Sequence, residues 1–480
     1  MAGQQQWTKI LPRPITKALL VLQIKHVNRR QVPHLGIPLP CSRPHAPAPP
    51  PNPPPLPPRP NHHRRCHPPK PLLPLSPPFF HHSPRPPFPF SPFHPSRRRK
   101  RQRPRPLRQP PHAKLHDPIL NWFNSHPNPP VAIVSDFFLG WTQHLAHQLN
   151  IPRLAFFPSG AFFASIDDYI WNNVQQLKPL DEVELSPLPG SPVFKSCHLP
   201  SLFRLYVKSD PDWEIVKDLK LANTKSWGFV FNSFEAMEGE YMDYLKKTLN
   251  HDRIFRVGPL NLAGLGNSGS GSNPNDRVLT WLDGCPKESV VYVCFGSQKL
   301  LKRDQIEALA VGLEKSGTRF VWVVKTGKQG DGFGIVPDGF EERVAGRGMV
   351  IREWVSQVSI LSHEAVGGFL SHCGWNSVLE GVVGGVMILA WPMEADQFVN
   401  ARLLVEEMRV AVRVCEGHDS VPDPDELGRV IGESMREMGG LKGKAKELKE
   451  RALEAVTNEG SSVRNLVRFV GKLRKLQSHT

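Results

Sequence analysis

The chain has 480 residues, enough for two or three domains, and a formal net charge of +16. The charge is uneven, because residues 1–116 hold 21 Lys or Arg and no Asp or Glu, which leaves the remaining residues with a net charge of −5. A basic protein can bind nucleic acid or an anionic membrane, but here the positive charge belongs to the N-terminal segment, so we expect no such partner for the globular part. No run of 18 apolar residues predicts a membrane span, and the start lacks the small-residue cleavage site of a signal peptide. Seven scattered cysteines without a C-x-x-C pair indicate a reduced protein of the cytoplasm.

Residues 1–114 are rich in proline, arginine and histidine and are predicted to be disordered. Proline removes backbone donors and fixes φ, which disfavours helices and central strands in the densest part, residues 44–111. Three interpretations are open: a basic tail that binds nucleic acid or a membrane, a proline-rich segment that docks partners, or a segment translated out of frame from a C-rich coding region. We favour the third, because Pro, His, Arg, Ser and Leu share C-rich codons and the segment contains no acidic residue.

Residues 115–260 are predicted to form a partial α/β domain. Short apolar runs, each ending in a polar turn, are typical of buried parallel strands. They predict strands at 131–134, 154–157 and 227–231, with helices at 118–123, 137–149 and 235–249. A stretch rich in Gly and Ser, residues 261–276, is the expected linker to a second domain.

Residues 277–440 alternate strand and helix patterns and are predicted to form a second domain of the same class. Strands are expected at 290–295, 320–324, 349–351, 366–370, 386–391 and 411–414, and helices at 278–282, 304–316, 398–407 and 425–435. Residues 441–480 are helical and basic, and we expect them to pack across the interface between the two domains.

The stretch 354–397 places polar turns after two of these apolar runs. The first run ends at Ser371 and precedes a helical pattern, and the second ends shortly before Asp396. In a parallel α/β sheet such turns lie at the carboxyl ends of the strands, where ligands bind. Asn376 and Ser377 stand where the helix is expected to begin, and their side chains and free backbone N–H groups suit an anion such as a diphosphate.

The same stretch resembles the signature box of plant secondary-product glycosyltransferases, the UDP-sugar-dependent enzymes of the GT-B fold. The positions that carry the resemblance are Trp354, Gln357, Ile360, Leu361, His363, Gly367, Phe369, His372–Ser377, Glu380, Gly385, Val386, Trp391, Pro392, Asp396 and Gln397. Segments 131–141, 226–234, 257–259, 290–297 and 421–427 also look like family landmarks, so the resemblance covers about residues 115–480. Ser356 and Met387 depart from the box, each standing where the family usually has a proline that shapes a turn.

The resemblance implies two Rossmann-like domains facing across a cleft, an N-terminal domain that binds the acceptor, and a C-terminal domain, 277–440, that binds the UDP-sugar. By the family's pattern, Trp354 stacks on the uracil, Val355 and Gln357 reach the uracil and ribose, and Glu380 accepts the ribose hydroxyls. A buried core Trp and a solvated helix Glu are the plain structural alternatives.

The family's pattern also implies residues for the diphosphate and the sugar. Ser297, His372, Asn376 and Ser377 are expected to hold the phosphates, and Trp375, Asp396 and Gln397 to contact the sugar hydroxyls. A His after an apolar strand is otherwise ordinary core filling. Gln397 resembles the residue of glucose-preferring members, although rhamnose users occur among similar enzymes.

The resemblance fails at the N-terminus. The family carries its general base in a Gly-His pair after a first buried strand, and residues 1–114 contain no such arrangement; His26 and His34 are the nearest candidates. Asp136 matches the carboxylate that orients this His, and its alternative role is a helix N-cap. The family needs no metal, and we assign no metal role to the D-P-D sequences at 210–212 and 423–425.

The expected function is therefore inverting transfer of a sugar, glucose from UDP-glucose, to a hydroxyl of a flavonoid-like phenol by a monomeric enzyme without a cofactor. The sequence leaves open a UDP-rhamnose donor with a flavonol 7-hydroxyl as acceptor. It also leaves open a UDP-sugar-binding relative impaired by loss of the base, and a basic-tail binder of nucleic acid or membrane.

Overall fold

The computed structural model describes residues 19–20, 115–264, 275–297, 299–327, 333–436 and 440–477. Of residues 1–114, which were expected to be disordered, the structure describes only a two-residue strand, β1 (Leu19–Leu20); the rest of this expectation lies outside the described residues. Most of the expected linker, 261–276, also lies outside them. None of the helices in the described ranges is long and apolar enough to cross a membrane.

The N-terminal half is built on a parallel sheet with β1 at its edge. Its strand order is β1-β2-β3-β6-β7, where β1 pairs antiparallel and the others pair parallel. The strands are β2 (Ile133–Asp136), β3 (Arg153–Phe157), β6 (Gly228–Phe231) and β7 (Ile254–Arg256), and a separate hairpin joins β4 (Glu182–Glu184) to β5 (Val193–Lys195). The strand order of β2, β3, β6 and β7 follows the chain without a reversal.

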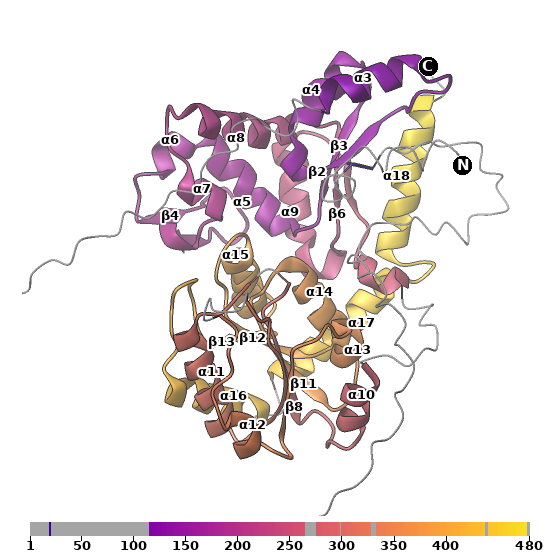
Figure 1. The fold of residues 1–480 in the computed structure, drawn as a ribbon. Helices are drawn as coiled ribbons and strands as arrows, with labels where there is room; N and C mark the ends of the chain where they lie inside the picture. The colour runs from indigo at the N-terminus through magenta and orange to yellow at the C-terminus, as the bar shows by residue number, and fades with distance from the viewer. Residues whose placement is uncertain are drawn as a thin grey trace, which may run out of the picture. The chain divides into compact units, whose positions relative to one another are not determined.

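Helices surround this sheet (Figure 1). They are α3 (His116–Ser125), α4 (Trp141–Gln148), α5 (Ala161–Asn172), α6 (Val174–Leu177), α7 (Ser201–Leu205), α8 (Pro211–Ala222) and α9 (Glu235–Thr248), with short 3-10 turns at η3 (Phe137–Leu139), η4 (Ser196–His198), η5 (Asn223–Lys225) and η6 (Leu260–Gly264). The single helix expected at 137–149 is instead η3 followed by α4. Gly140 separates the two, and a Cβ built there would lie 1.9 Å from the Leu219 carbonyl oxygen of α8.

The C-terminal half is a six-stranded parallel sheet with the order β10-β9-β8-β11-β12-β13. Its strands are β8 (Val290–Cys294), β9 (Arg319–Val323), β10 (Gly348–Ile351), β11 (Val366–Ser371), β12 (Met387–Ala390) and β13 (Ala411–Arg413). Its helices are α10 (Asn275–Asp283), α11 (Arg303–Lys315), α12 (Phe340–Arg343), α13 (Gln357–Leu361), α14 (Trp375–Gly384), α15 (Gln397–Arg402) and α16 (Pro424–Arg436), and a π-helical turn, η7 (Leu403–Glu407), continues α15. The strand order reverses between β8 and β11.

Every strand expected from an apolar run is present within two residues of its expected bounds. The sequence missed β7, which is only three residues long, and the hairpin of β4 and β5, which carries exposed charges on alternate positions. It also treated 398–407 as one regular helix, whereas its second half widens to the π-helical turn η7.

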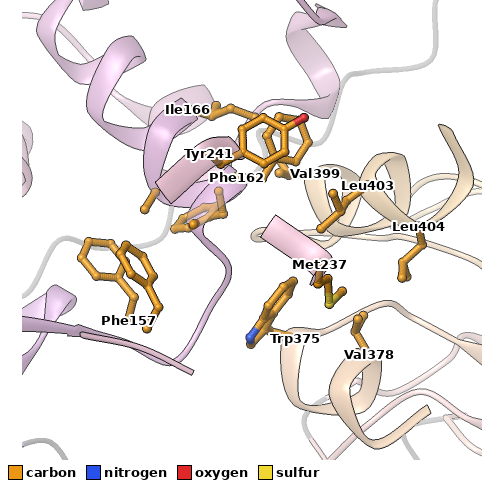
Figure 2. Close-up of a cluster of buried hydrophobic side chains, with 14 of the residues drawn as sticks. Phe157, Phe162, Ile166, Met237, Tyr241, Trp375, Val378, Val399, Leu403 and Leu404 are labelled. Atoms are coloured by element: carbon orange, nitrogen blue, oxygen red, sulfur yellow. The ribbon is translucent and has the colours of Figure 1, made fainter. Parts of the chain in front are cut away.

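Apolar side chains of both halves form one continuous core. Helices α5 and α9 of the N-terminal half meet α14, α15 and η7 of the C-terminal half there (Figure 2). Phe162, Met237 and Tyr241 face Trp375 and Leu403 across this boundary, and all five are at least 95% buried. Removing this apolar area from water favours apposition of the two halves.

The last two helices connect the halves a second time. Helix α17 (Leu441–Ala455) contacts both α14 and α9, and α18 (Ser461–Gln477) packs on β7. Arg468 donates to the Ile254 carbonyl at 2.6 Å, and the Phe255 and Phe469 rings lie 5.2 Å apart.

A buried charged group lies behind the end of strand β2. Lys220 of α8 pairs with Asp167 of α5 at 3.1 Å, and both side chains are buried. Its ammonium also lies 4.4 Å from the centre of the Phe137 ring. The carboxylate and the aromatic face offset the free-energy cost of burying the Lys220 cation, and this offset is lost if either partner is removed.

We predict that Lys220→Met lowers the free energy of unfolding of the N-terminal half by about 3–5 kcal/mol, because it leaves the Asp167 carboxylate buried without its cation. Urea unfolding followed by tryptophan fluorescence measures the change. The matched control is Lys246→Met, which removes an exposed pair with Asp243 and should cost less than about 1 kcal/mol. Equal losses for the two variants would contradict this assignment.

Candidate functional site

Three neighbouring strands of the C-terminal sheet bring the expected donor residues together. Strand β11 lies between β8 and β12, and Ser371 is in register with both Cys294 and Ala390. The turns after these strands carry Ser297, His372 and Asp396, so residues that are far apart in sequence meet at one edge of the sheet. This edge includes the point where the strand order reverses, which is where open α/β sheets bind ligands.

His372 is held between two glycines. A Cβ built on Gly296 would lie 2.8 Å from the imidazole Cε1, and one built on Gly374 would lie 2.5 Å from Nε2. Gly296 also has a φ of +75°, which disfavours other residues. The two turns thus close on the ring from both sides and fix its position.

The environment of His372 keeps the imidazole neutral. Burial, together with the positive charge of Lys299, lowers the pKa of His372 to about 4. The buried Nδ1 has no hydrogen-bond partner within the described part of the chain. A neutral ring with an unused polar atom is suited to hydrogen-bonding a phosphate oxygen.

Helix α14 begins directly after this turn. Gly374 precedes it in an extended conformation, and Cys373 has a φ of +61°, which is rare for a residue with a side chain. The backbone N–H groups of the first turn have no partners within the helix, so they form an anion-binding end. Asn376 is exposed at this end, and Ser377 is buried beside Gln357.

Gln357 positions the residue expected to bind the ribose. Its Nε2 donates to Glu380 Oε2 at 2.6 Å and to Ser377 Oγ at 3.0 Å. Its side chain is buried, so the amide acts from inside the protein. The structure therefore gives Gln357 the task of orienting Glu380, which a sequence comparison alone cannot distinguish from direct contact with the ligand.

Trp354 and Val355 differ in accessibility. Trp354 is 56% exposed, which is unusual for so large an apolar side chain and leaves ring surface accessible for stacking. The Val355 side chain is 3% exposed and packs in the apolar core under β10 and β11. The contact expected of Val355 with uracil or ribose can therefore come only from its backbone.

The turn after β12 holds the residues expected at the sugar. Ala395 has a φ of +58°, so this turn also contains a side-chain-bearing residue in the left-handed region. Gln397 Oε1 accepts from the backbone N–H groups of Met393 and Glu394, both at 3.0 Å, which fixes its amide. Asn400 donates to Asp396 at 3.0 Å, and burial raises the pKa of Asp396 above its usual range although this hydrogen bond acts against the increase.

The Trp375 indole does not point freely into the donor site. Its Nε1 donates to the Asn232 carbonyl oxygen of the N-terminal half at 2.8 Å, and the residue is 4% exposed. An indole has only one donor, and in Trp375 that donor is already used. A contact between Trp375 and the sugar would have to come from the backbone.

Asp136 ends strand β2 and caps the turn that follows. Its Oδ1 accepts from the Phe138 N–H at 2.8 Å, which is the N-cap role named as the alternative. Burial raises the pKa of Asp136, whereas the Phe138 N–H, Lys220 and Arg153 act in the opposite direction. No histidine among the described residues is hydrogen-bonded to Asp136.

The sequence did not identify the lysines around these carboxylates and phosphate-binding groups. Burial raises the pKa of both Asp136 and Asp396, and the charge of Lys220 acts against this increase at both carboxyls. Lys325 donates to the Ser297 carbonyl, and Lys299 lies close enough to depress the pKa of His372. A chain with 60 Lys and Arg gives no pattern that distinguishes these three.

Comparisons with known proteins agree with this site. The family model described as UDP-glucoronosyl and UDP-glucosyl transferase matches residues 273–420, a range that contains every expected donor residue. UDP-glycosyltransferase 89A2 of Arabidopsis thaliana is 53% identical over 366 residues, which cover 76% of this chain and 77% of the relative. The chain belongs to the UDP-glycosyltransferase family. Flavonol 3-O-glucosyltransferase UGT89B1 of the same plant is 48% identical over 75% of this chain and 76% of the relative.

Solved structures of the UDP-glycosyltransferase family share the fold. The complex of Arabidopsis thaliana UGT89C1 with UDP-L-rhamnose has a TM-score of 0.59 at 40% identity and covers 75% of this chain and 77% of that chain. A UDP-glucosyltransferase from Polygonum tinctorium has a TM-score of 0.65 at 34% identity, with 75% and 79% covered. The fold is therefore GT-B, with two Rossmann-like domains, as the sequence predicted.

The two D-P-D sequences of this UDP-glycosyltransferase lie at helix starts. No group of three or more His, Cys, Asp or Glu in the described ranges is arranged to hold a metal ion. Asp210 and Asp423 of the two D-P-D sequences instead accept hydrogen bonds from backbone N–H groups at the starts of α8 and α16. Both aspartates therefore act as helix caps.

We predict that His372 makes the free energy of unfolding depend on pH. Between pH 6 and pH 5 the native imidazole stays neutral, while in the unfolded chain, with an ordinary pKa of about 6.5, it gains a proton. The unfolded state thus binds more protons, and stability falls as the pH falls. Over this interval the free energy of unfolding should drop by about 1 kcal/mol more in the parent chain than in His372→Gln.

Urea unfolding of both proteins at pH 6 and pH 5 measures this difference. The exposed His147→Gln is the control and should follow the parent chain. An identical pH response in His372→Gln and the parent chain would show that His372 is not held neutral.

Proposed function

We propose that this chain transfers glucose from UDP-glucose to a phenolic hydroxyl of a flavonoid-like acceptor. The observation that carries the proposal is the convergence of the turns after β8, β11 and β12 on one edge of the sheet, with His372 fixed at its centre. The names of similar proteins support the acceptor class: flavonol 3-O-glucosyltransferase at 48% identity, and UGT89C1 crystallised with quercetin at 39% identity.

In the proposed reaction an acceptor oxygen attacks the anomeric carbon of the sugar. The bond between this carbon and the diphosphate oxygen breaks, UDP leaves with the electron pair, and the proton of the acceptor hydroxyl passes to a base. His372, Ser297, Asn376 and the first turn of α14 stabilise the negative charge that develops on the leaving diphosphate. Glu380, oriented by Gln357, accepts the ribose hydroxyls and fixes the nucleotide.

The donor sugar has one competing candidate. Flavonol 7-O-rhamnosyltransferase of Arabidopsis thaliana is 39% identical over 75% of this chain, and UGT89C1 has been crystallised with UDP-L-rhamnose. Gln397, the first residue of α15, supports glucose because it resembles the residue of glucose-preferring members of the family, and its amide is fixed by two backbone N–H groups. The higher identity to the glucosyltransferase also supports glucose.

A second candidate function is UDP-sugar binding without turnover. It is favoured by Asp136, whose carboxylate caps η3 and has no histidine partner among the described residues. In the proposed enzyme this carboxylate would orient the base, so a chain without that base would bind the donor and transfer little.

We further propose that the protein acts as a monomer in the cytoplasm. The five cysteines in the described ranges are all free, which suits a reducing compartment.

Titration calorimetry of the full chain with UDP, followed by incubation with quercetin and either UDP-glucose or UDP-L-rhamnose, tests these alternatives. We expect micromolar UDP binding and a glucoside as the main product. UDP binding without any glycoside would support the second candidate, and a rhamnoside would assign the other donor. Absence of UDP binding at millimolar concentration would overturn the proposal.

We also predict that Trp354→Ala weakens UDP binding by about 10- to 100-fold, because it removes the exposed ring surface on which the base stacks. Trp354→Phe keeps an aromatic face and should lose less than about tenfold. Titration with UDP compares the two variants with the parent chain. If Trp354→Ala binds UDP as tightly as the parent chain, the uracil lies elsewhere.

A further inference from the structure

The turn after β6 is bonded to two separate segments of the chain through three hydrogen bonds. The Asn232 carbonyl accepts from the Trp375 indole at 2.8 Å, and the Asn232 side chain accepts from the Leu260 N–H at 2.9 Å. The Ser233 carbonyl accepts from the Gly258 N–H at 3.0 Å. One short turn of the N-terminal half is thus joined both to helix α14 of the donor site and to the segment leading out of β7.

The C-terminal helix adds a further contact to the same region. Ser462 of α18 donates to the Gly258 carbonyl at 2.6 Å, so Gly258 is bonded on both sides. A Cβ on Gly258 would lie 2.4 Å from the Asn232 side-chain oxygen, which shows how closely the two segments pack. A shift of the Asn232–Ser233 turn would therefore move the chain that joins the two halves.

The space around the Trp375 ring is filled on the side of the N-terminal half. A Cβ on Gly160 would lie 2.6 Å from the ring atom Cη2 and 2.3 Å from Glu238 Oε1. Glu238 is itself fixed, because it accepts hydrogen bonds from the Phe162 N–H and the Ser233 hydroxyl. The indole thus has one position, determined by groups of the opposite half.

Trp375 is also the first residue of α14. The next two residues, Asn376 and Ser377, belong to the expected diphosphate-binding end, and His372 lies three residues before it. An anion bound at this end orders the same turn that carries the indole. The residues expected to bind the diphosphate are thus adjacent in sequence to Trp375, whose indole contacts the N-terminal half.

We propose that Trp375 is a positioning residue that ties the diphosphate-binding start of α14 to the Asn232–Ser233 turn, so that donor binding orders the segment between the two halves. This inference rests on the proposed donor site. It differs from a direct role in sugar recognition, because the indole N–H is bonded to the protein itself.

Hydrogen exchange of the full chain with and without UDP tests this inference. In the parent chain, UDP should slow exchange in residues 372–380 and also in residues 258–262, where the Gly258 and Leu260 amides are bonded to the turn. In Trp375→Phe, which keeps a ring but removes the N–H, protection of 372–380 should remain, while the slowing at 258–262 should fall by about fivefold, the effect of one neutral hydrogen bond.

Gly160→Ala is the second variant. It replaces no residue of the expected donor site and displaces the Trp375 ring from the side of the N-terminal half, so it should also disconnect 258–262 from UDP binding. In assays of sugar transfer, both variants should lower kcat by about tenfold to 100-fold relative to the parent chain, while the Kd for UDP changes by less than about threefold. Substitution of a residue that only fills the core would not lower kcat while leaving the Kd for UDP unchanged.

Trp391→Phe is the matched control, since Trp391 is equally buried but its indole nitrogen has no hydrogen-bond partner in the described structure. It should show the parent's UDP-dependent protection. Unchanged protection of 258–262 in both Trp375→Phe and Gly160→Ala would overturn this inference. Absence of UDP binding in the parent chain would instead overturn the proposed function, so the two failures are distinguishable.

Discussion

The parallel pairing of β8, β11 and β12 is the constraint on which the donor site depends. Because the three strands point the same way and their ends are in register, the turns after them must meet at one edge of the sheet. The reversal of strand order between β8 and β11 leaves that edge open to a ligand. Residues in these turns, such as Ser297 and Gln397, therefore lie close together in space although they are far apart in the sequence.

Fixed geometry within this edge comes from close packing and backbone conformation. A Cβ at Gly296 or Gly374 would crowd the His372 ring, and two residues with side chains, Cys373 and Ala395, adopt the left-handed region. Such conformations cost free energy, which the surrounding parallel sheet offsets, and they are frequent at ligand sites. Burial keeps the His372 imidazole neutral, so in the proposed donor site it would act as a hydrogen-bonding group rather than as a fixed charge.

The two halves of the molecule differ in what they provide. The C-terminal sheet contains a reversal of strand order and therefore a complete ligand edge. The described strands β2, β3, β6 and β7 follow one another without a reversal, so this part of the N-terminal sheet provides no such edge. Asp136 ends β2 and caps η3 through its hydrogen bond with the Phe138 N–H.

The sequence by itself determined the fold class and the buried parallel strands that are continuous apolar runs, and the unusual residue pattern of the 354–397 box indicated the family. It could not show that Val355 is buried, that Gln357 holds Glu380, or that the Trp375 indole is bonded to Asn232. These facts depend on contacts between segments up to 143 residues apart, which no local pattern encodes. Only the tertiary structure decides which polar atoms are already paired and which remain available to a ligand.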